Sequence, residues 1–299
     1  MPELFFLMKH TKKKFTKFFF LSVFTFLVSF AVFSNISCSS LRQEPLAQVS
    51  SVSDISRDLQ WKTLTDYAET ADFFITEKKT LCHLVRINLL SENFSIVSFP
   101  DTKKDSSIRA KKFAKQNDCD IVINTTPFSQ KIRFISKQVP AGIIYSNNEQ
   151  LYKPNARYSA LAFYNDGTKY SAKIIERQSD EQLTLALKQS PCIIHGGFWQ
   201  ILKDGEVIDF KDIKDSRTAL GISRDGTKLY ILIVEGERKS TSLGLSYMEC
   251  ARILLENDCY NAIQFDGGNS SCLILDQKNA LSYPKNPNLS AFLGFCGKK

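Results

Sequence analysis

The stretch TALGISRDGTKLYILIV, residues 218–234, contains two apolar runs that are interrupted by Asp225 and Gly226. An Asp-Gly pair between apolar runs is a strong signal for a β-hairpin turn. The runs are rich in β-branched and aromatic residues, as strands are. We therefore predict a β-hairpin over this stretch, with its turn at Asp225-Gly226.

The next segment, SYMECARILLEND at 246–258, follows a helical pattern. Met248, Ala251, Leu254 and Leu255 lie on one stripe, and the segment starts with a Ser-x-x-Glu capping box. Similar reasoning predicts helices at 107–118 and 179–189, strands at 81–90, 93–99 and 119–124, and a hairpin at 159–175. Many strands with few helices indicate an α+β body with mixed sheets and a few flanking helices, not repeating βαβ units.

The strand that follows this helix ends in AIQFDGGNSS, residues 262–271. Asp266 comes directly after the apolar residues, and Gly267 and Gly268 allow a tight turn or a close approach to the backbone. Ser270 and Ser271 add short hydrogen-bonding groups. A simple hairpin turn and a functional site both fit this pattern.

Three other predicted strands also end or begin with polar residues. Asn124 ends the strand at 119–124, His195 precedes a glycine pair, and Arg217 precedes the hairpin at 218–234. Strand ends are common places for functional loops because the sheet holds those loops in position. These groups together predict a site for an anionic substrate that is rich in hydroxyl groups.

Five motifs occur in the order found in the phosphodiester glycosidase family, which the chain resembles over roughly residues 80–299. They are IVINTTPF (121–128), PAGIIYSNNEQL (140–151), IIHGGFWQILKDGEVI (193–208), the run from Arg217 to Leu255, and NAIQFDGGNSSCLIL (261–275). The best-known activity of that family removes N-acetylglucosamine from a phosphodiester. The resemblance implies that this chain is a hydrolase that cleaves a sugar from a sugar-1-phosphodiester of envelope or scavenged glycans. A glycan-binding surface lipoprotein that does not cleave its ligand is the alternative.

The resemblance matches Asn124, Phe128, Arg217, Asp266 and the two glycines after it to the family pattern. It also shows departures. The chain reads EGER from Glu235 where family members often have Asp-Gly-Arg, it has Asn269 in place of a third glycine, and it lacks an arginine in NPNLSAFLGF (286–295).

Asp266 is the predicted acid, base or nucleophile, because carboxylates carry out glycoside hydrolysis. Glu235 is the predicted second carboxylate, although a hairpin turn at Glu235-Gly236 fits as well. His195 is a predicted proton donor, or else a hydrogen-bonded loop histidine.

The predicted substrate-binding residues are Asn124, Arg217, Gly267, Gly268, Ser270 and Ser271. Asn124 holds a sugar hydroxyl or caps its own loop. Arg217 clamps a phosphate through its planar fork, or else pairs with Asp212 or Asp215. The Gly-Gly amides form a phosphate-binding nest or a plain turn. Trp61 and Trp199 either stack on a sugar or fill the core.

The N-terminus has the layout of a signal sequence over 1–37, with a lysine-rich start and an apolar run from Phe18 to Phe33. Cys38 follows it as a lipoprotein cysteine would, and 38–58 is a serine-rich tether. We therefore predict a folded domain at 59–299, lipidation at Cys38, and an exported protein that is anchored by lipid to the bacterial cell envelope. Cleavage without lipidation is the alternative.

The chain of 299 residues has a formal charge of +8, and the part after residue 37 has only +4, which does not indicate a nucleic-acid partner. The seven cysteines after Cys38 form no C-x-x-C motif and do not cluster with histidines. We expect few or no disulfides, no metal and no cofactor, with a carbohydrate phosphodiester and the membrane as partners.

Overall fold

The computed structural model describes residues 47–49, 59–102, 107–130, 137–236 and 242–298. The predicted signal sequence and Cys38 lie outside these residues. Leu46–Lys299 forms one unit, and strand β1, Ala47–Val49, falls inside the predicted tether, where it pairs in parallel with β3. Among the described residues, no helix is both long and apolar enough to span a bilayer.

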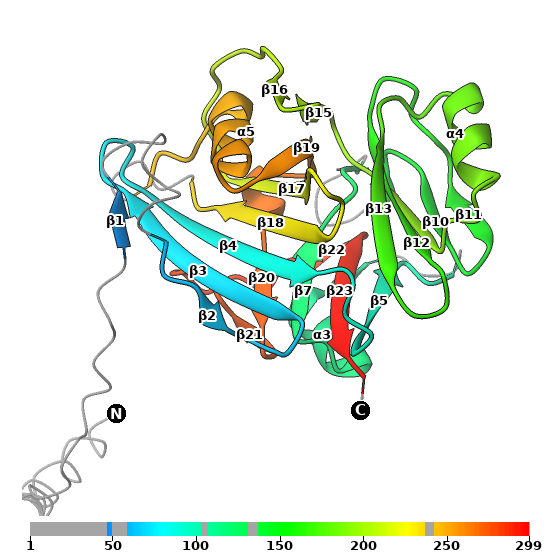
Figure 1. Cartoon of the computed structure of the whole chain (residues 1–299), viewed down its shortest axis with the longest axis horizontal. Coiled ribbons are helices and arrows are strands. Elements are labelled where there is room, and N and C mark those ends of the chain that lie inside the picture. The colour runs from blue at the N-terminus through cyan, green and yellow to red at the C-terminus, as the bar shows by residue number, and fades with distance from the viewer. Residues whose placement is uncertain (1–46, 50–58, 103–106, 131–136, 237–241, 299) are drawn as a thin grey trace, which may run out of the picture. The chain divides into compact units, whose positions relative to one another are not determined.

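A nine-stranded sheet is the largest element of the fold (Figure 1). Its strands run in the order β1-β3-β4-β18-β17-β19-β15-β16, and β2 pairs with β3. They are β2 (Lys62–Thr63), β3 (Ala68–Ile75), β4 (Thr80–Asn88), β15 (Gln200–Lys203), β16 (Glu206–Val207), β17 (Arg217–Ser223), β18 (Lys228–Val234) and β19 (Cys259–Gln264). The β1–β3 pair is parallel and the pairs around the hairpin are antiparallel, so the sheet is mixed, as predicted.

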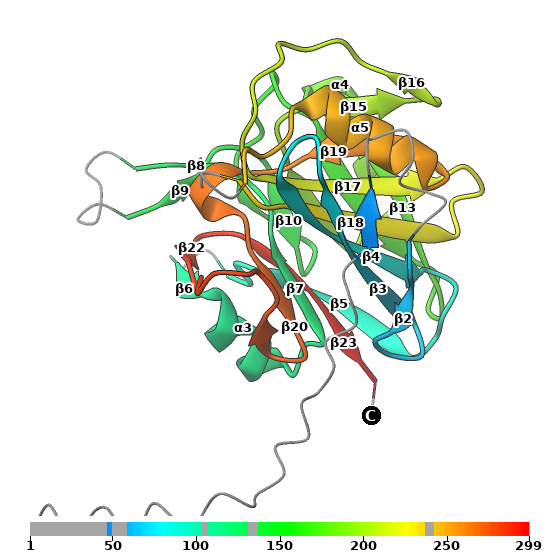
Figure 2. The same ribbon diagram turned by 90° about the vertical axis from the view of Figure 1, so that its left-hand side faces the viewer.

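Two five-stranded sheets and two short pairs complete the fold. One sheet has the order β11 (Glu149–Tyr152), β10 (Ile144–Ser146), β14 (Ile193–Gly196), β12 (Ala160–Asn165) and β13 (Tyr170–Ile175). The other has the order β21 (Lys278–Asn279), β20 (Leu273–Leu275), β7 (Ile121–Asn124), β23 (Phe292–Gly297) and β5 (Phe94–Phe99). The short pairs are β22 (Asn288–Leu289) with β6 (Ile108–Arg109) and β8 (Phe128–Ser129) with β9 (Val139–Pro140). The β8–β9 pair projects from the body in Figure 2.

The predicted hairpin at 218–234 is confirmed as β17 and β18. Arg217 pairs with Val234 at its open end and Ile222 with Leu229 near its turn. Both strands are central in the sheet, and their residues are buried on both faces. Leu229, Ile231 and Ile233 face one cluster of buried residues, whereas Tyr230, Leu232 and Val234 face another. This explains why β18 is continuously apolar and does not alternate.

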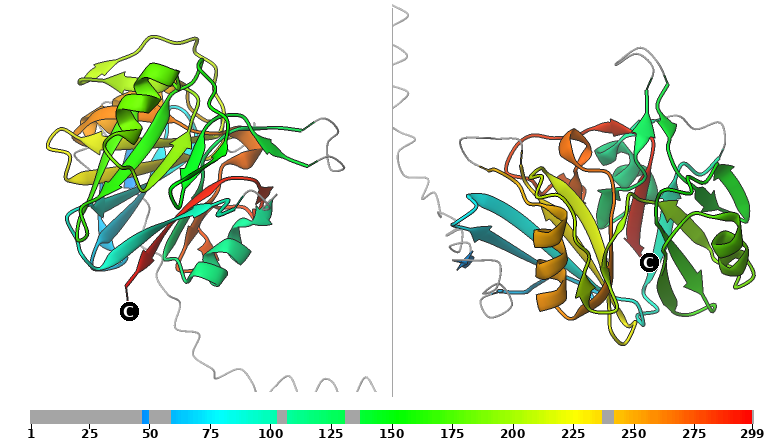
Figure 3. Two further views of the ribbon diagram at one scale, coloured as in Figure 1. Left: turned by 90° about the vertical axis from the view of Figure 1, so that its right-hand side faces the viewer. Right: turned by 90° about the horizontal axis from the view of Figure 1, so that it is seen from above.

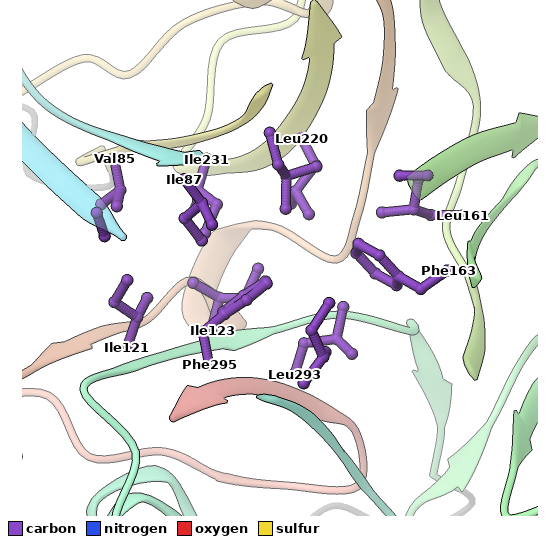
Figure 4. Packing of buried hydrophobic residues seen from close by; sticks show 14 of the residues in the cluster. Val85, Ile87, Ile121, Ile123, Leu161, Phe163, Leu220, Ile231, Leu293 and Phe295 are labelled. Atoms are coloured by element: carbon purple, nitrogen blue, oxygen red, sulfur yellow. The ribbon is translucent and has the colours of Figure 1, made fainter. Parts of the chain in front are cut away.

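The main core lies where the three large sheets meet. Figure 4 shows Ile87 and Ile231 of the nine-stranded sheet opposite Ile123 and Phe295 of the sheet that contains β7. Phe163, from the sheet that contains β12, lies beside them. This packing holds the ends of β7, β17 and β19 in fixed positions relative to one another.

The structure has three α-helices in its described part, and they lie on outer faces of the sheets (Figures 1 and 3). They are α3 (Ala110–Asn117), α4 (Asp180–Leu187) and α5 (Tyr247–Glu256). Ser246 and Glu249 form the predicted capping box of α5. At α4 the Ser179 side chain accepts from the Gln182 amide. Gln182 Oε1 accepts from the Arg177 amide and not from the Ser179 amide, so α4 has an N-cap but no complete capping box.

One disulfide joins Cys119, two residues before β7, to Cys296 on β23. Five other cysteines are free in the described part of the chain. The expectation of few disulfides is therefore consistent with this pair.

Candidate active site

Asn124, at the end of β7, connects three segments that are distant in sequence. Its Nδ2 donates to the Asp266 carbonyl oxygen at 2.7 Å, and its Oδ1 accepts from Thr218 Oγ1 at 2.8 Å and from the Cys272 amide at 3.0 Å. The side chain is 1% exposed. Asn124 therefore positions the Asp266 loop, and its amide is already occupied within the protein. The loop-capping interpretation fits this geometry, whereas the predicted contact with a sugar hydroxyl does not.

Asp266 lies two residues after the end of β19, and the chain there passes from one sheet to another. The strand before it belongs to the nine-stranded sheet, whereas β20, which follows the short 3₁₀ helix Gly268–Ser270, belongs to the sheet that contains β7. A hairpin turn is therefore excluded at this position. The Asp266 amide donates to the Thr125 carbonyl oxygen at 2.9 Å, which fixes the loop against the end of β7.

The Asp266 carboxyl has an unusual pKa for an aspartate. Burial raises this pKa to about 6, and the charge of Asp215 adds to the effect. Hydrogen bonds from Ser270 and from the Gly267 amide, together with the charge of Lys285, oppose it. A half-buried carboxyl with a pKa near neutrality can both donate and accept a proton, which is typical of functional sites.

The glycine pair keeps the loop close to the start of β17. A Cβ atom on Gly267 would lie 2.7 Å from the Ser216 carbonyl oxygen, so only glycine fits there. The Gly268 amide donates to that same carbonyl at 2.9 Å. The Gly267 amide donates to Asp266 Oδ1, and the Ser270 and Ser271 amides donate to Gly267 and Gly268. Protein acceptors therefore occupy these amides, which fits the interpretation as a turn better than an open amide nest for phosphate.

Two hydroxyl groups near this loop are buried. The Oγ atoms of Ser216 and Ser271 are buried, and neither has a hydrogen-bond partner among the described residues. Buried polar groups are nearly always hydrogen-bonded in folded proteins. The Ser216 and Ser271 hydroxyls are thus unusual in having no partner within the described protein.

Arg217 begins β17 and is 7% exposed. Its Nε donates to the Leu245 carbonyl at 2.9 Å and its Nη2 donates to the Ile213 carbonyl. The guanidinium carbon lies 4.5 Å from the centre of the Tyr247 ring. The predicted two-pronged phosphate clamp is not available, because the Nε–Nη2 edge holds backbone carbonyls. The Nη1 atom lies 3.8 Å from the Cβ position of Gly267 and places positive charge beside the loop.

Glu235 is not an open second carboxylate. It is 2% exposed and accepts from His83 Nε2 at 2.9 Å, from the Ser282 amide at 2.6 Å and from the Ser282 hydroxyl. Burial opposes ionisation of this carboxyl, but the hydrogen bonds from His83 and Ser282 outweigh it and lower the pKa of Glu235. The predicted catalytic role of Glu235 therefore does not fit its surroundings.

His195 is fully buried on β14, and both of its ring nitrogens are occupied. Nδ1 lies 2.7 Å from Thr125 Oγ1 and Nε2 lies 2.8 Å from Ser98 Oγ. Burial lowers the pKa of His195 to about 3, so the ring is neutral near physiological pH. A role for His195 as a proton donor to a leaving group does not fit these surroundings, whereas the alternative of a hydrogen-bonded histidine does. Through these two hydrogen bonds, His195 connects β14 to β5 and to the loop after β7.

Sequence reasoning missed Lys285. Its Nζ donates to the Gly268 carbonyl oxygen at 3.1 Å, and its charge lowers the pKa of Asp266. The segment 286–295 lacks the arginine of the family pattern, and a lysine directly before it is the signal that could have identified this second cation. Groups of three or more metal-ligating side chains do not occur in the part of the chain that the structure describes.

The sequence model of the phosphodiester glycosidase family matches residues 117–293. This range is more than half of the chain and includes Asn124, Arg217, Asp266 and Lys285. The chain belongs to this family.

Two curated relatives match over shorter spans. The chain is 38% identical over 77 residues to N-acetylglucosamine-1-phosphodiester alpha-N-acetylglucosaminidase of Bos taurus, which covers 26% of this chain and 14% of that protein. It is 26% identical over 172 residues to the SPbeta prophage-derived uncharacterized protein YomE of Bacillus subtilis (strain 168), which covers 55% of this chain and 26% of that one. The matched region thus spans about a quarter or less of each relative's length.

Two solved structures share the fold. The zebrafish N-acetylglucosamine-1-phosphodiester alpha-N-acetylglucosaminidase catalytic domain, auto-inhibited by its pro-peptide, superposes with a TM-score of 0.60 at 18% identity, over 81% of this chain and 88% of that one. A hypothetical protein from Synechocystis superposes with a TM-score of 0.59 at 13% identity, over 79% and 63% of the two chains. Both likenesses establish the α+β fold.

Proposed function

We propose that this protein hydrolyses the bond between the anomeric carbon of a sugar and a phosphodiester, with Asp266 as the reacting carboxyl. The observation that carries the proposal is the placement of a half-buried Asp266 carboxyl where β7, β17 and β19 converge, with Arg217 and Lys285 beside its loop. Burial also raises the pKa of Asp266 to about 6. Family membership supplies the reaction class.

Hydrolysis at an anomeric carbon builds positive charge on the sugar ring. The ionised Asp266 carboxylate stabilises this charge or attacks the carbon, and its pKa also allows it to deliver a proton. The departing phosphodiester is a weak base, so it needs little help from a strong general acid. A neutral, buried His195 is therefore compatible with this chemistry.

The anionic phosphate needs positive charge and hydrogen-bond donors. Arg217 Nη1 lies 3.8 Å from the Cβ position of Gly267, and the Lys285 ammonium donates to the Gly268 carbonyl oxygen. The Ser216 and Ser271 hydroxyls have no partner among the described residues. Charge-assisted hydrogen bonds to phosphate oxygens are stronger than neutral ones. We assign phosphate binding to these side chains in place of the Gly267 and Gly268 amides.

The test is incubation of the purified protein with a panel of sugar-1-phosphodiesters and analysis of the products by mass. We expect release of the free sugar and a phosphomonoester from at least one member. If the protein binds panel members in calorimetry but releases no sugar, the alternative of a non-catalytic glycan-binding lipoprotein replaces this proposal.

We further propose that the protein is exported and anchored to the cell envelope through lipidated Cys38. The support is the signal-like segment at 1–37 and the Cys119–Cys296 disulfide, since disulfides persist in oxidising compartments. Cys38→Ser should release the protein from the membrane fraction. Retention of that variant in the membrane, or a mature N-terminus elsewhere, would refute the anchor.

A further inference from the structure

Five aromatic rings form a continuous strip next to the candidate site. This aromatic strip consists of Tyr158, Phe198, Trp199, Phe210 and Tyr247. Trp199 is its centre and contacts all four other rings at centroid distances between 5.3 and 6.0 Å. Trp199 is 37% exposed, and the other four rings are half-buried.

The aromatic strip is joined directly to the residues around Asp266. The Phe198 amide donates to the Gln264 carbonyl at 2.7 Å, and the Gln264 amide donates to the Trp199 carbonyl at 2.9 Å. Gln264 precedes Asp266 by two residues. At the other end of the strip, the Tyr247 ring lies 4.5 Å from the Arg217 guanidinium carbon. The aromatic strip therefore lies beside the residues that flank Asp266, at Gln264 and at Arg217.

The other tryptophan of the chain has a different environment. Trp61 is half-buried, its ring is covered by the Arg86 guanidinium at 4.3 Å, and the Tyr230 ring contacts it edge-on at 6.4 Å. Trp199 has aromatic neighbours and an open surface. A large exposed aromatic surface beside a polar site is a common feature of ligand-binding sites.

We infer that the aromatic strip is the subsite for the sugar ring of the substrate, with the C–H face of the pyranose stacked on Trp199. The inference rests on the proposed hydrolysis, because it identifies which part of that substrate lies where. An aromatic face carries partial negative charge and attracts the weakly positive C–H groups of a sugar ring. The exposed side chains of Asp209 and Lys211, on either side of Phe210, supply polar groups for the sugar hydroxyls.

The first experiment uses the intrinsic fluorescence of Trp199. The chain has two tryptophans, so the double variant Trp61→Phe/Asp266→Asn leaves Trp199 as the sole indole and blocks turnover. The probes are the 1-(methyl phosphate) esters of N-acetylglucosamine, glucose, mannose and galactose, with dimethyl phosphate as the probe that lacks a sugar. We expect a saturable change in Trp199 emission with at least one sugar probe and none with dimethyl phosphate. No response to any sugar probe, or an equal response to dimethyl phosphate, overturns the inference.

The second experiment measures kinetics. Trp199→Ala should raise KM about tenfold, the range expected for loss of one aromatic stacking contact, while Trp199→Phe should give a smaller increase. Leu185→Ala, which removes an exposed apolar side chain on α4, should leave KM unchanged. Thermal melts show whether each variant is folded, and the fluorescence titration does not depend on Trp199→Ala folding.

The two experiments separate this inference from the proposed function. If no phosphodiester is hydrolysed but Trp199 emission responds to a sugar probe, the subsite is supported and the proposed hydrolysis fails. If hydrolysis occurs and Trp199→Ala has the KM of the unaltered protein, the hydrolysis is supported and the subsite fails.

Discussion

Asp266 and Glu235 are both carboxylates at strand ends, yet their surroundings give them opposite properties. Glu235 is 2% exposed and contacts His83, whose own pKa is raised to about 9 by Asp72 and Glu235 against the effect of burial. Asp266 is half-buried, has only hydroxyl and amide donors in direct contact, and has a pKa raised to about 6. A buried carboxylate with a full set of partners stabilises the fold, whereas one without a charged partner is available for chemistry.

The comparison also separates positioning from reaction. Asn124, His195 and Glu235 all have hydrogen-bond partners within the protein at both polar atoms of their side chains, although each resembles a functional residue in the sequence. Groups whose hydrogen-bonding capacity is filled cannot bind substrate without first breaking those bonds.

The largest expected effect comes from Asp266→Asn, which keeps the shape of the side chain and removes its charge. We expect turnover to fall by about a thousandfold, as for loss of a reacting carboxylate, with wild-type or higher thermal stability. Asp276→Asn, at an exposed turn, is the control and should leave turnover unchanged. Near-normal turnover of Asp266→Asn would remove the carboxylate role from this residue.

Glu235→Gln makes the same chemical change at the other carboxylate and should have the opposite outcome. It leaves the buried, protonated His83 without its buried counter-ion, which costs about 3 kcal/mol of unfolding free energy. Denaturant unfolding should show this loss, whereas the folded fraction should retain its turnover. If the variant keeps its stability but loses turnover, Glu235 belongs to the reaction centre after all.

Lys285→Met tests the cation that contacts the Asp266 loop. We expect KM for a phosphodiester to rise about tenfold, because one charge-assisted contact to phosphate is lost. The pKa of Asp266 should also rise, since the Lys285 charge lowers it, and the pH–rate profile should shift upward. Lys278→Met, at an exposed surface pair, is the matched control. An unchanged profile would place Lys285 outside the site.

The pH dependence of stability is the smallest effect and also distinguishes the two carboxylates. The pKa of Asp266 is about 6 in the folded state against an ordinary value of 3.8, so its contribution to stability is lost as pH rises through that interval. The pKa of His83 is about 9 against 6.5, so the contribution of the His83–Glu235 pair is lost as pH rises from about 6.5 to 9.

Melting temperatures measured against pH therefore provide the test. Asp266→Asn should flatten the curve below pH 6 or so, and Glu235→Gln should flatten it on the alkaline side. If Asp266→Asn changes only the alkaline side, the assignment of the two titrations is incorrect.

Much of the secondary structure could be predicted because it depends on neighbours in sequence. The hairpin at 218–234, the capped helix Tyr247–Glu256 and the strand before Asp266 all follow from local periodicity and turn chemistry. The α+β class follows from the number and order of these elements. The family resemblance, and with it Asp266, could also be read from the sequence.

The roles of individual residues could not be predicted in the same way. Asn124 contacts Asp266 across 142 positions, and His83 contacts Glu235 across 152. Whether a side chain has a full set of partners depends on these distant contacts, which leave no trace in local patterns.

The sequence by itself thus determined most of the strands and helices, the family, and Asp266 as the candidate reacting carboxylate. Only the tertiary structure decided that the pKa of Asp266 is raised and that protein partners occupy the hydrogen-bonding groups of His195 and Glu235. It also brought Lys285 and Trp199 close to the candidate site. The physical reason is that secondary structure depends on interactions within a few residues, whereas burial and charge environment arise when distant segments pack together.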